Sequence, residues 1–369
     1  MDENSLLDKS ALKVNSGIEQ PPIVNPNAIQ RLKKTKQKPL SVDEYVEGII
    51  NGNRTILSKA ITLVESALPE HHLMGQEIIE KCLPYSSSSI RIGITGVPGA
   101  GKSTFIESFG KLITSKGHKL AVLAIDPSSS RSKGSILGDK TRMETLSTDE
   151  NAFIRPSPSA GSLGGVARKT RESVILCEAA GFDVVFIETV GVGQSETAVH
   201  SMVDFFLLLM IAGAGDELQG IKRGIMEMAD LLVINKADGS NIMKAQQSRA
   251  EYQSAMQLFP PTDSGWKPKA LTCSALERMG LDDIWEAIDT YITLTKGNGF
   301  FELHRRQQSK YWLYESINES LTDNFYHHPI IEKNLEHLEN QVLEDKVSSF
   351  AAARQLLSLY LNNPNNTNN

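Results

Sequence analysis

Cysteine is scarce in this sequence. Its 369 residues include three cysteines, Cys82, Cys177 and Cys273, which lie far apart and form no Cys-x-x-Cys pair. This pattern excludes a disulfide framework and a zinc-finger spacing, and it is typical of a reducing compartment. Aromatic residues are also few, at 6%, but hydrophobic residues reach 40%. The chain therefore has enough apolar material for a packed core and is not mainly disordered.

A surplus of basic charge and a long apolar run are missing too. The formal net charge is -6, which argues against a generic nucleic-acid binder, because that function needs a basic surface. The longest apolar run, residues 205–212, is far shorter than the roughly 20 residues of a membrane-spanning helix, and it predicts a buried parallel strand. The acidic, polar N-terminus resembles neither a signal peptide nor a transit peptide, so we expect a cytoplasmic protein.

Length and composition divide the chain into parts. At roughly 100–200 residues per domain, one large or two ordinary domains are expected. A polar arm with a basic stretch at its end precedes a helical segment, an α/β core and a second helical segment, and we expect the arm and the short tail to be disordered. The predicted boundaries are 1–40, 41–88, 89–296, 297–362 and 363–369.

The predicted elements follow from the hydrophobic spacing. In the first helical segment, apolar residues from Leu57 to Leu68 share one helical face, Pro69 helps to end that helix, and a second helix covers about 73–83. From residue 90, β-rich and helical runs alternate, as in a parallel sheet covered on both sides. The predicted strands are 90–95, 120–125, 184–188, 205–211, 231–235 and 270–273. After a break at Gly297 and Gly299, the predicted helices are 303–325, 330–343 and 347–361.

A phosphate-binding motif follows the first predicted strand. The letters GVPGAGKS at residues 96–103 fit the pattern GxxxxGK[ST], and a helical pattern follows them, which is the context the motif requires. The glycines let backbone N–H groups surround phosphates, Lys102 would reach the β- and γ-phosphates, and Ser103 would hold Mg²⁺. We therefore predict an α/β P-loop NTPase fold, a mostly parallel sheet flanked by helices with helical extensions at both ends. The predicted phosphate-binding residues are Gly96, Val97, Pro98, Gly99, Ala100, Gly101, Lys102, Ser103 and Thr104.

A second motif points to guanine. Residues 235–238, NKAD, end the predicted strand 231–235 and resemble the NKxD element with which GTPases read the base. The Asp238 carboxylate can accept from both N1–H and the N2 amino group of guanine, whereas adenine has no such donor pair. With Asn235, Lys236 would line the base and the P-loop. The loop Ser274, Ala275 and Leu276 resembles the one whose backbone meets guanine O6.

The segment expected to act in hydrolysis begins at Glu188, the last residue of a predicted strand. This chain has Glu188-x-x-Gly191 where ordinary GTPases carry Asp-x-x-Gly. The Glu188 carboxylate can hold Mg²⁺, and the Gly191 N–H can donate to the γ-phosphate. Val192 stands where Ras-like proteins place the glutamine that orients water. Gln194 is close but out of that register, so it is either catalytic or a surface residue. We expect slow intrinsic hydrolysis that a partner or a conformational change completes.

Further candidates lie in polar loops at the same edge of the sheet. Asp126 ends the strand 120–125 and points to the end where ligands bind in such folds. The Gly- and Ser-rich loop 127–142 is a candidate switch, and its Asp139 is either a metal ligand or a helix cap. Loops 155–165 and 212–224 are candidate mobile segments.

Together these segments resemble the MeaB/ArgK family of P-loop GTPases associated with methylmalonyl-CoA mutase, to which the human methylmalonic aciduria type A protein belongs. The resemblance extends over about residues 42–361, and the glutamate at 188 is what this family has. The segments that carry it are 60–66, 96–104, 124–143, 153–167, 186–196, 213–225 and 235–238.

The resemblance implies a GTP-hydrolysing chaperone of a B12-dependent acyl-CoA mutase, usually methylmalonyl-CoA mutase. It would gate adenosylcobalamin loading and protect or reactivate the mutase, with the cobalamin on the partner rather than on this chain. It also implies that Lys102, Asp126, Asp139 and Glu188 surround Mg²⁺ and phosphate, and that the C-terminal helices form a homodimer. The apolar residues that either face that partner or pack on the chain's own core are Trp312, Ile317, Leu321, Leu335, Leu338, Val342 and Leu357.

Other functions stay open at this point. A nickel-inserting GTPase needs clustered Cys or His ligands, but the adjacent histidine pairs, 71–72 and 327–328, are expected on the surface. A kinase, which the older ArgK label suggests, needs an acceptor site and usually ATP, against which NKAD argues. A GTP-dependent scaffold and an ATP-using P-loop protein are the remaining alternatives.

Overall fold

The computed structural model describes residues 40–66, 68–125, 143–156, 163–189, 195–213 and 223–362. The chain divides into two units, Met1–Ser41 and Val42–Asn369. The elements that follow belong to the second unit. The predictions for residues 1–39 and for the tail 363–369 fall outside the described residues.

The core is a seven-stranded sheet in which every pairing is parallel. Its strand order is β3-β2-β4-β1-β5-β6-β7, and most strand residues are buried, as expected when helices cover both faces. The predicted fold class is therefore confirmed. The strands are β1 (Ile90–Gly96), β2 (Leu120–Ile125), β3 (Ala152–Arg155), β4 (Val184–Thr189), β5 (Phe205–Ile211), β6 (Leu231–Asn235) and β7 (Lys269–Thr272).

The strand β3 is missing from the sequence prediction, which began a loop at residue 155. It has four residues and pairs along the outer edge of β2, from Ala152 opposite Leu120. So short a run has no readable periodicity, and polar residues flank it. Tertiary contacts hold it instead: Arg155 forms an ion pair with Glu65, and Arg54 donates to the carbonyl oxygen of Ala152.

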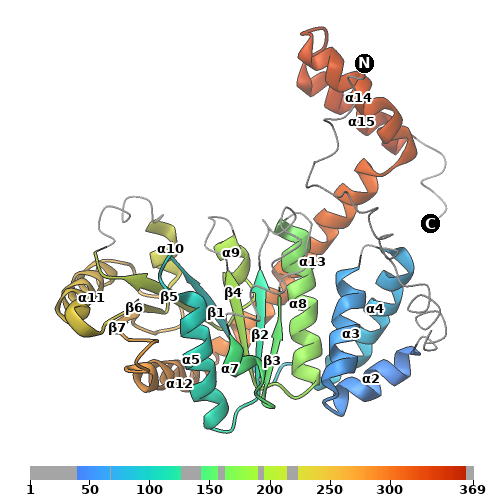
Figure 1. The fold of residues 1–369 in the computed structure, drawn as a ribbon. Coiled ribbons are helices and arrows are strands. Elements are labelled where there is room, and N and C mark those ends of the chain that lie inside the picture. Colours follow the sequence, from blue (N-terminus) through green and yellow to red (C-terminus); the bar gives the residue numbers. More distant parts are fainter. Residues whose placement is uncertain are drawn as a thin grey trace, which may run out of the picture. The chain divides into compact units, whose positions relative to one another are not determined.

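Helices form a layer on each face of the sheet (Figure 1). Neighbouring aromatic residues of β5 show the two layers, because successive side chains of a strand point to opposite faces. Phe205 meets Tyr291 of α12 (Leu281–Gly297), while Phe206 meets His200 of α9 (Ser195–His200). The helices α5 (Lys102–Ser115) and α12 contact each other in the first layer, and α8 (Leu163–Ala179) contacts both α9 and α13 (Phe300–Tyr326) in the second. The remaining core helices are α7 (Glu144–Ser147), α10 (Arg223–Met228) and α11 (Ile242–Met256).

The first helical segment contains α2 (Val42–Ile50), α3 (Arg54–Glu65) and α4 (Pro69–Cys82). The predicted buried stripe of α3 is confirmed from Leu57 to Val64. Its predicted end is wrong: α3 stops at Glu65, Leu68 is 57% exposed, and Pro69 begins α4. Proline suits the first position of a helix, because its missing N–H has no intrahelical partner there.

The C-terminal helices agree with the prediction within a few residues. α12 ends at Gly297, and α13 follows Gly299, whose φ of 77° favours glycine. α14 (Pro329–Leu343) and α15 (Ser349–Leu361) pack on each other around Ile331, Leu338, Ala352 and Leu356. The apolar residues predicted to need a partner or a core divide accordingly. Trp312 and Leu338 are buried, Leu335 and Val342 pack against the α14–α15 cluster, and Ile317, Leu321 and Leu357 are about half exposed.

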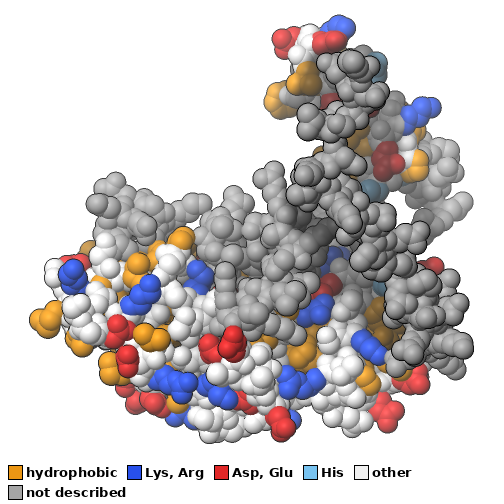
Figure 2. Space-filling view, viewed as in Figure 1, with side chains coloured by type: hydrophobic (Ala, Val, Ile, Leu, Met, Phe, Trp, Pro, Cys, Tyr) orange, Lys and Arg blue, Asp and Glu red, His pale blue; other side chains and the backbone are white. Residues whose placement is uncertain are grey.

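The described surface mixes charges of both signs. In Figure 2, Lys and Arg side chains alternate with Asp and Glu along the edge below the sheet, and apolar side chains lie singly or in small groups among them. Among the described helices, none is long and apolar enough to cross a membrane.

Candidate functional site

The glycine-rich loop joins β1 to α5 at the carboxyl end of the sheet. Gly99 and Gly101 have φ values of 77° and 84°, in the left-handed region that favours glycine. At Gly96 a Cβ would collide with the carbonyl oxygen of Leu209 on β5. The N–H of Ala100 donates to the carbonyl oxygen of Val97 at 3.1 Å. The loop thus has the tight curvature that lets backbone N–H groups face a phosphate.

Lys102 is the first residue of α5 and folds back over this loop. Its Nζ donates to the carbonyl oxygen of Gly96 at 2.9 Å. Burial lowers the pKa of Lys102, and the nearby carboxylates of Glu188 and Glu196 oppose that shift. Ser103 is half-buried beside it and Thr104 is exposed. The lysine is therefore held by the loop, with two acidic side chains near it.

Glu188 lies at the tip of β4, between β1 and β2. It pairs with Ile94 on one side and with Ala124 on the other, and its side chain is half-buried. The next residue, Thr189, donates from its hydroxyl to the hydroxyl of Thr95 at 2.7 Å, one residue before the P-loop begins. The structure therefore brings the predicted metal-binding glutamate to the strand tip beside the P-loop.

Some predicted site residues lie outside the described part of the chain. They are Asp126, Asp139, Gly191 and Gln194, together with Val192 and the candidate switch loop 127–142. Asp126 follows Ile125, which pairs with Thr189 at the tip of β4. Within the described ranges, no group of three or more His, Cys, Asp or Glu residues is placed to hold a metal ion.

Glu196 is a residue whose proximity to the site the sequence analysis missed. It lies in the first turn of α9 and is 4% exposed, and its charge acts on Lys102. The sequence contained a signal, because Glu196 is the last residue of the segment 186–196, which carries the family resemblance. Its burial depends on tertiary packing, which that segment alone does not show.

Asn235 connects the two halves of the predicted nucleotide site. Its side chain is buried at the end of β6, where Nδ2 donates to the carbonyl oxygen of Ala100 in the P-loop at 2.8 Å. Its Oδ1 accepts from the N–H of Ala275 at 3.0 Å. Ser108 of α5 also donates to the carbonyl oxygen of Ala275 at 2.7 Å. The phosphate loop and the base-side loop are thus tied together by a buried side chain.

Asp238 and Lys236 lie on the base side of this link. Asp238 is half-buried and accepts a 2.5 Å hydrogen bond from the hydroxyl of Ser274. Lys236 has a φ of 59°, and its Cε comes within 3.8 Å of the position that a Cβ on Gly101 would take. Ala275 is buried, while Leu276 is 75% exposed. The structure brings together the predicted base-reading residues and places the Lys236 stem beside the P-loop.

The sequence model of the family "Methylmalonyl Co-A mutase-associated GTPase MeaB" matches residues 57–329, which contain the P-loop, the Glu188 segment and NKAD. The chain belongs to the MeaB family of GTPases. It is 50% identical over 283 residues to GTPase ArgK of Escherichia coli strain K12, covering 77% of this chain and 86% of that protein. It is 45% identical over 329 residues to the "Methylmalonic aciduria type A homolog, mitochondrial" of Mus musculus, covering 86% and 79% of the two chains.

A solved structure agrees with the fold of this MeaB-family chain. The crystal structure of "LAO/AO transport system kinase" superposes with a TM-score of 0.70 at 39% identity and covers 89% of this chain and 100% of that one. The resemblance seen in the sequence is thereby confirmed. The chain is a P-loop GTPase, and its family implies that it binds GTP and GDP.

Proposed function

We propose that this MeaB-family GTPase is a chaperone of a B12-dependent acyl-CoA mutase, with methylmalonyl-CoA mutase as its client. It gates adenosylcobalamin loading and protects or reactivates the mutase, and the cobalamin resides on the client. The family relationship carries this proposal, because the family's name joins a GTPase to methylmalonyl-CoA mutase. The link that Asn235 makes between the P-loop and the base-side loop supports nucleotide binding at this site.

We assign the roles within the site as follows. The P-loop N–H groups and Lys102 bind the β- and γ-phosphates, and Ser103 and Glu188, with Asp126 and Asp139, hold Mg²⁺. Hydroxyl and carboxylate oxygens are ligands that suit Mg²⁺, and the described ones, Ser103 and Glu188, lie at neighbouring element ends beside the P-loop. The metal neutralises charge that develops on the phosphates, while Lys102 keeps a positive charge at the loop. Gln194 or a group from the client orients the attacking water.

The role of the client is tested by GTP hydrolysis with purified full-length chain, alone and with methylmalonyl-CoA mutase from the same cell. Basal turnover is expected to be slow and to rise about tenfold or more with the mutase, because a partner that completes a phosphoryl-transfer site has a large effect on rate. Lys102→Ala serves as the background control. Tight GTP binding without any response to the mutase would contradict this choice of client, and the other B12-dependent acyl-CoA mutases would be tested next.

Asp238→Asn tests the base-reading assignment. Replacing the acceptor carboxylate by an amide puts a donor opposite the guanine donors, so GTP affinity is expected to fall by roughly 10- to 100-fold. Xanthosine triphosphate is expected to gain affinity, because its base offers an acceptor at that position. Titration with fluorescent nucleotide analogues measures both. Glu251→Gln, an exposed carboxylate on α11, is the control, and unchanged GTP affinity in Asp238→Asn would mean that another group reads the base.

A further inference from the structure

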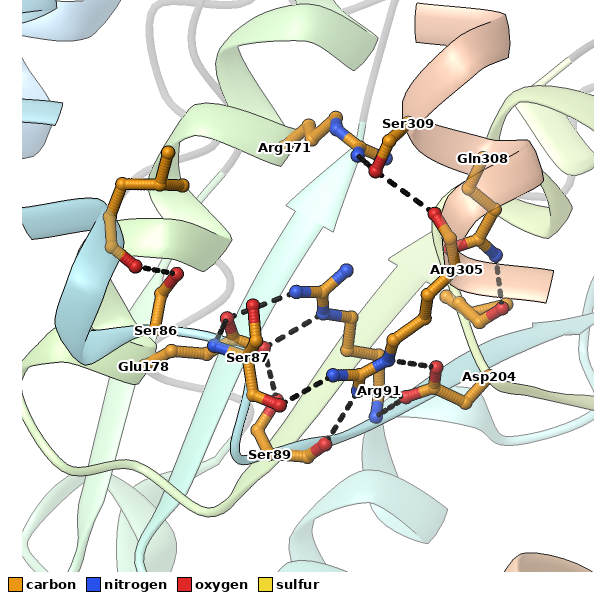
Figure 3. Close-up of polar contacts among 12 residues, drawn as sticks. Ser86, Ser87, Ser89, Arg91, Arg171, Glu178, Asp204, Arg305, Gln308 and Ser309 are labelled. Atoms are coloured by element: carbon orange, nitrogen blue, oxygen red, sulfur yellow. Dashed lines mark hydrogen bonds and ion pairs between the residues drawn. The ribbon is translucent and has the colours of Figure 1, made fainter. Parts of the chain in front are cut away.

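One face of α13 holds the turn that joins α9 to β5. Gln308 Nε2 donates to the carbonyl oxygen of Val203 at 2.7 Å, and Trp312 Nε1 donates to the carbonyl oxygen of Ser201 at 3.1 Å. Arg305 donates from Nε and Nη2 to the two carboxylate oxygens of Asp204, each at 2.7 Å (Figure 3). The spacing of these side chains along α13 places them on one side of the helix. We call Arg305, Gln308 and Trp312 the α13 clamp.

The α13 clamp is largely buried and forms several hydrogen bonds. Gln308 is 4% exposed and Trp312 is 7% exposed. Asp204 also accepts from the N–H of Arg91 at 2.8 Å, where β1 begins. Arg305 also donates to the carbonyl oxygens of Ser87 and Ser89, both at 2.7 Å. The turn 201–204 is therefore fixed both to α13 and to β1, through directed and partly charged hydrogen bonds.

The other end of α9 lies at the nucleotide site. Its first turn carries the buried Glu196, which lies near enough to Lys102 to oppose the lowering of the lysine's pKa. α9 and the turn that follows it pack closely on β1 because Gly93 has no Cβ: an added Cβ would lie 2.9 Å from Val199 Cγ1 of α9 and 3.1 Å from Val203 Cγ2 of the turn. Three residues beyond Gly93, β1 becomes the P-loop at Gly96. The short helix α9 and its turn thus lie between the strand that leads into the P-loop and the α13 clamp.

We propose that the α13 clamp transmits the nucleotide state of the GTP site to the C-terminal helices. Bound phosphate replaces the contact of Lys102 with the Gly96 carbonyl oxygen at the end of β1. Because α9 and the turn 201–204 are packed on β1 and bound to it, they move together with that strand, and the clamp passes the shift to α13. α14 begins three residues after α13 ends, so it moves with α13. This inference rests on the nucleotide site proposed above.

Hydrogen–deuterium exchange of the full chain tests the inference, with no nucleotide, with GDP and with a non-hydrolysable GTP analogue. In the wild-type protein, the GTP analogue is expected to change amide exchange several-fold, relative to GDP, both in the turn 201–204 and in the clamp-bearing half of α13. In Gln308→Ala/Trp312→Phe, where only Arg305 of the clamp still holds the turn, the change in α13 is expected to become smaller while the P-loop stays protected by nucleotide.

Two further variants serve as controls for the exchange experiment. Arg306→Ala removes an exposed neighbour on α13 and is expected to respond as the wild type does. Trp312→Phe alone keeps an aromatic ring, though a smaller one, and removes the N–H donor, so it is the mild variant should the double one fold poorly. Equal exchange in wild-type α13 under all conditions, with a protected P-loop, would overturn the inference, as would an unchanged response in the folded clamp variants. A P-loop that nucleotide leaves unprotected would overturn the nucleotide site itself, and the inference with it.

Discussion

Lys102→Ala is expected to reduce kcat/KM for GTP hydrolysis by about 10³-fold or more, because removal of one preorganised donor to the developing charge has an effect of that order in other enzymes. The side chain stands at the first position of α5, folded over the P-loop, where bound phosphate would replace the Gly96 carbonyl oxygen as the partner of its ammonium group. Loss of this cation should also weaken nucleotide binding, since the phosphates would keep only backbone donors and the metal. Phosphate release and fluorescent-nucleotide titration measure the two effects separately.

The control for Lys102→Ala is Lys116, the residue that caps the far end of α5. It pairs with Asp282 on the surface, and Lys116→Ala should hydrolyse GTP at the wild-type rate. Circular dichroism of both variants establishes that they are folded. Hydrolysis by Lys102→Ala at the wild-type rate would contradict the P-loop assignment, even if the family relationship stood.

The elements predicted correctly from the sequence are those whose structure is determined by a local residue pattern. The P-loop needs glycine at fixed positions, a strand before it and a helix after it, so the motif could be placed from its letters alone, and β1 and α5 occur where expected. The bounds of β5 and β6 were predicted correctly, because each strand is a continuous apolar run that is visible in the sequence. β3 was missed because its four residues are held by contacts from α3, which lies about 90 residues earlier in the chain.

Long-range side-chain links escaped prediction for a related reason. The letters NKAD indicate a base reader, but they do not show that Asn235 uses its amide to join Ala100 to Ala275. In α13, Arg305 and Gln308 read as ordinary polar residues of an amphipathic helix. Their partners, the turn 201–204 and the start of β1, lie more than 100 residues away. Such links depend on the assembled fold, and no local spacing encodes them.

The largest expected effect on stability comes from the ion pair between Arg91 and Glu178. Arg91 Nε and Nη2 donate to the two Glu178 oxygens at 2.8 and 3.0 Å, and the carboxylate also accepts from the Ser89 hydroxyl and the Ser87 N–H (Figure 3). The side chain of Glu178 is 0% exposed and that of Arg91 is 8% exposed. Burial alone would raise the pKa of Glu178, but Arg91 and these hydrogen bonds outweigh it and lower the pKa.

Glu178→Gln is expected to lower the free energy of unfolding by about 3–5 kcal/mol, because the guanidinium group of Arg91 stays buried without its counter-charge. Urea titration followed by circular dichroism measures the loss. Asp43→Asn, which breaks the exposed pair with Lys81, should lower the free energy of unfolding by no more than about 1 kcal/mol.

The stabilisation by Glu178 depends on pH. Because the pKa of Glu178 in the folded protein lies below its ordinary 4.5, the carboxylate's contribution to stability is present above that pH and is lost as the pH falls through the folded value. The difference between wild type and Glu178→Gln should therefore shrink in acid.

The double variant Arg91→Met/Glu178→Leu distinguishes two contributions to the free energy of unfolding: the destabilisation by an unpaired buried charge, and the net stabilisation by the intact ion pair. Removing both ions leaves neither member of the pair unpaired, but the Ser89 hydroxyl and the Ser87 N–H lose their acceptor, so the double variant is expected to recover part of what Glu178→Gln loses. Recovery would mean that the pair specifies how the start of β1 meets α8, more than it adds net stability. A loss in Glu178→Gln no larger than that of Asp43→Asn would contradict the argument, since it would mean that Asp204 or solvent neutralises Arg91 once Glu178 is gone.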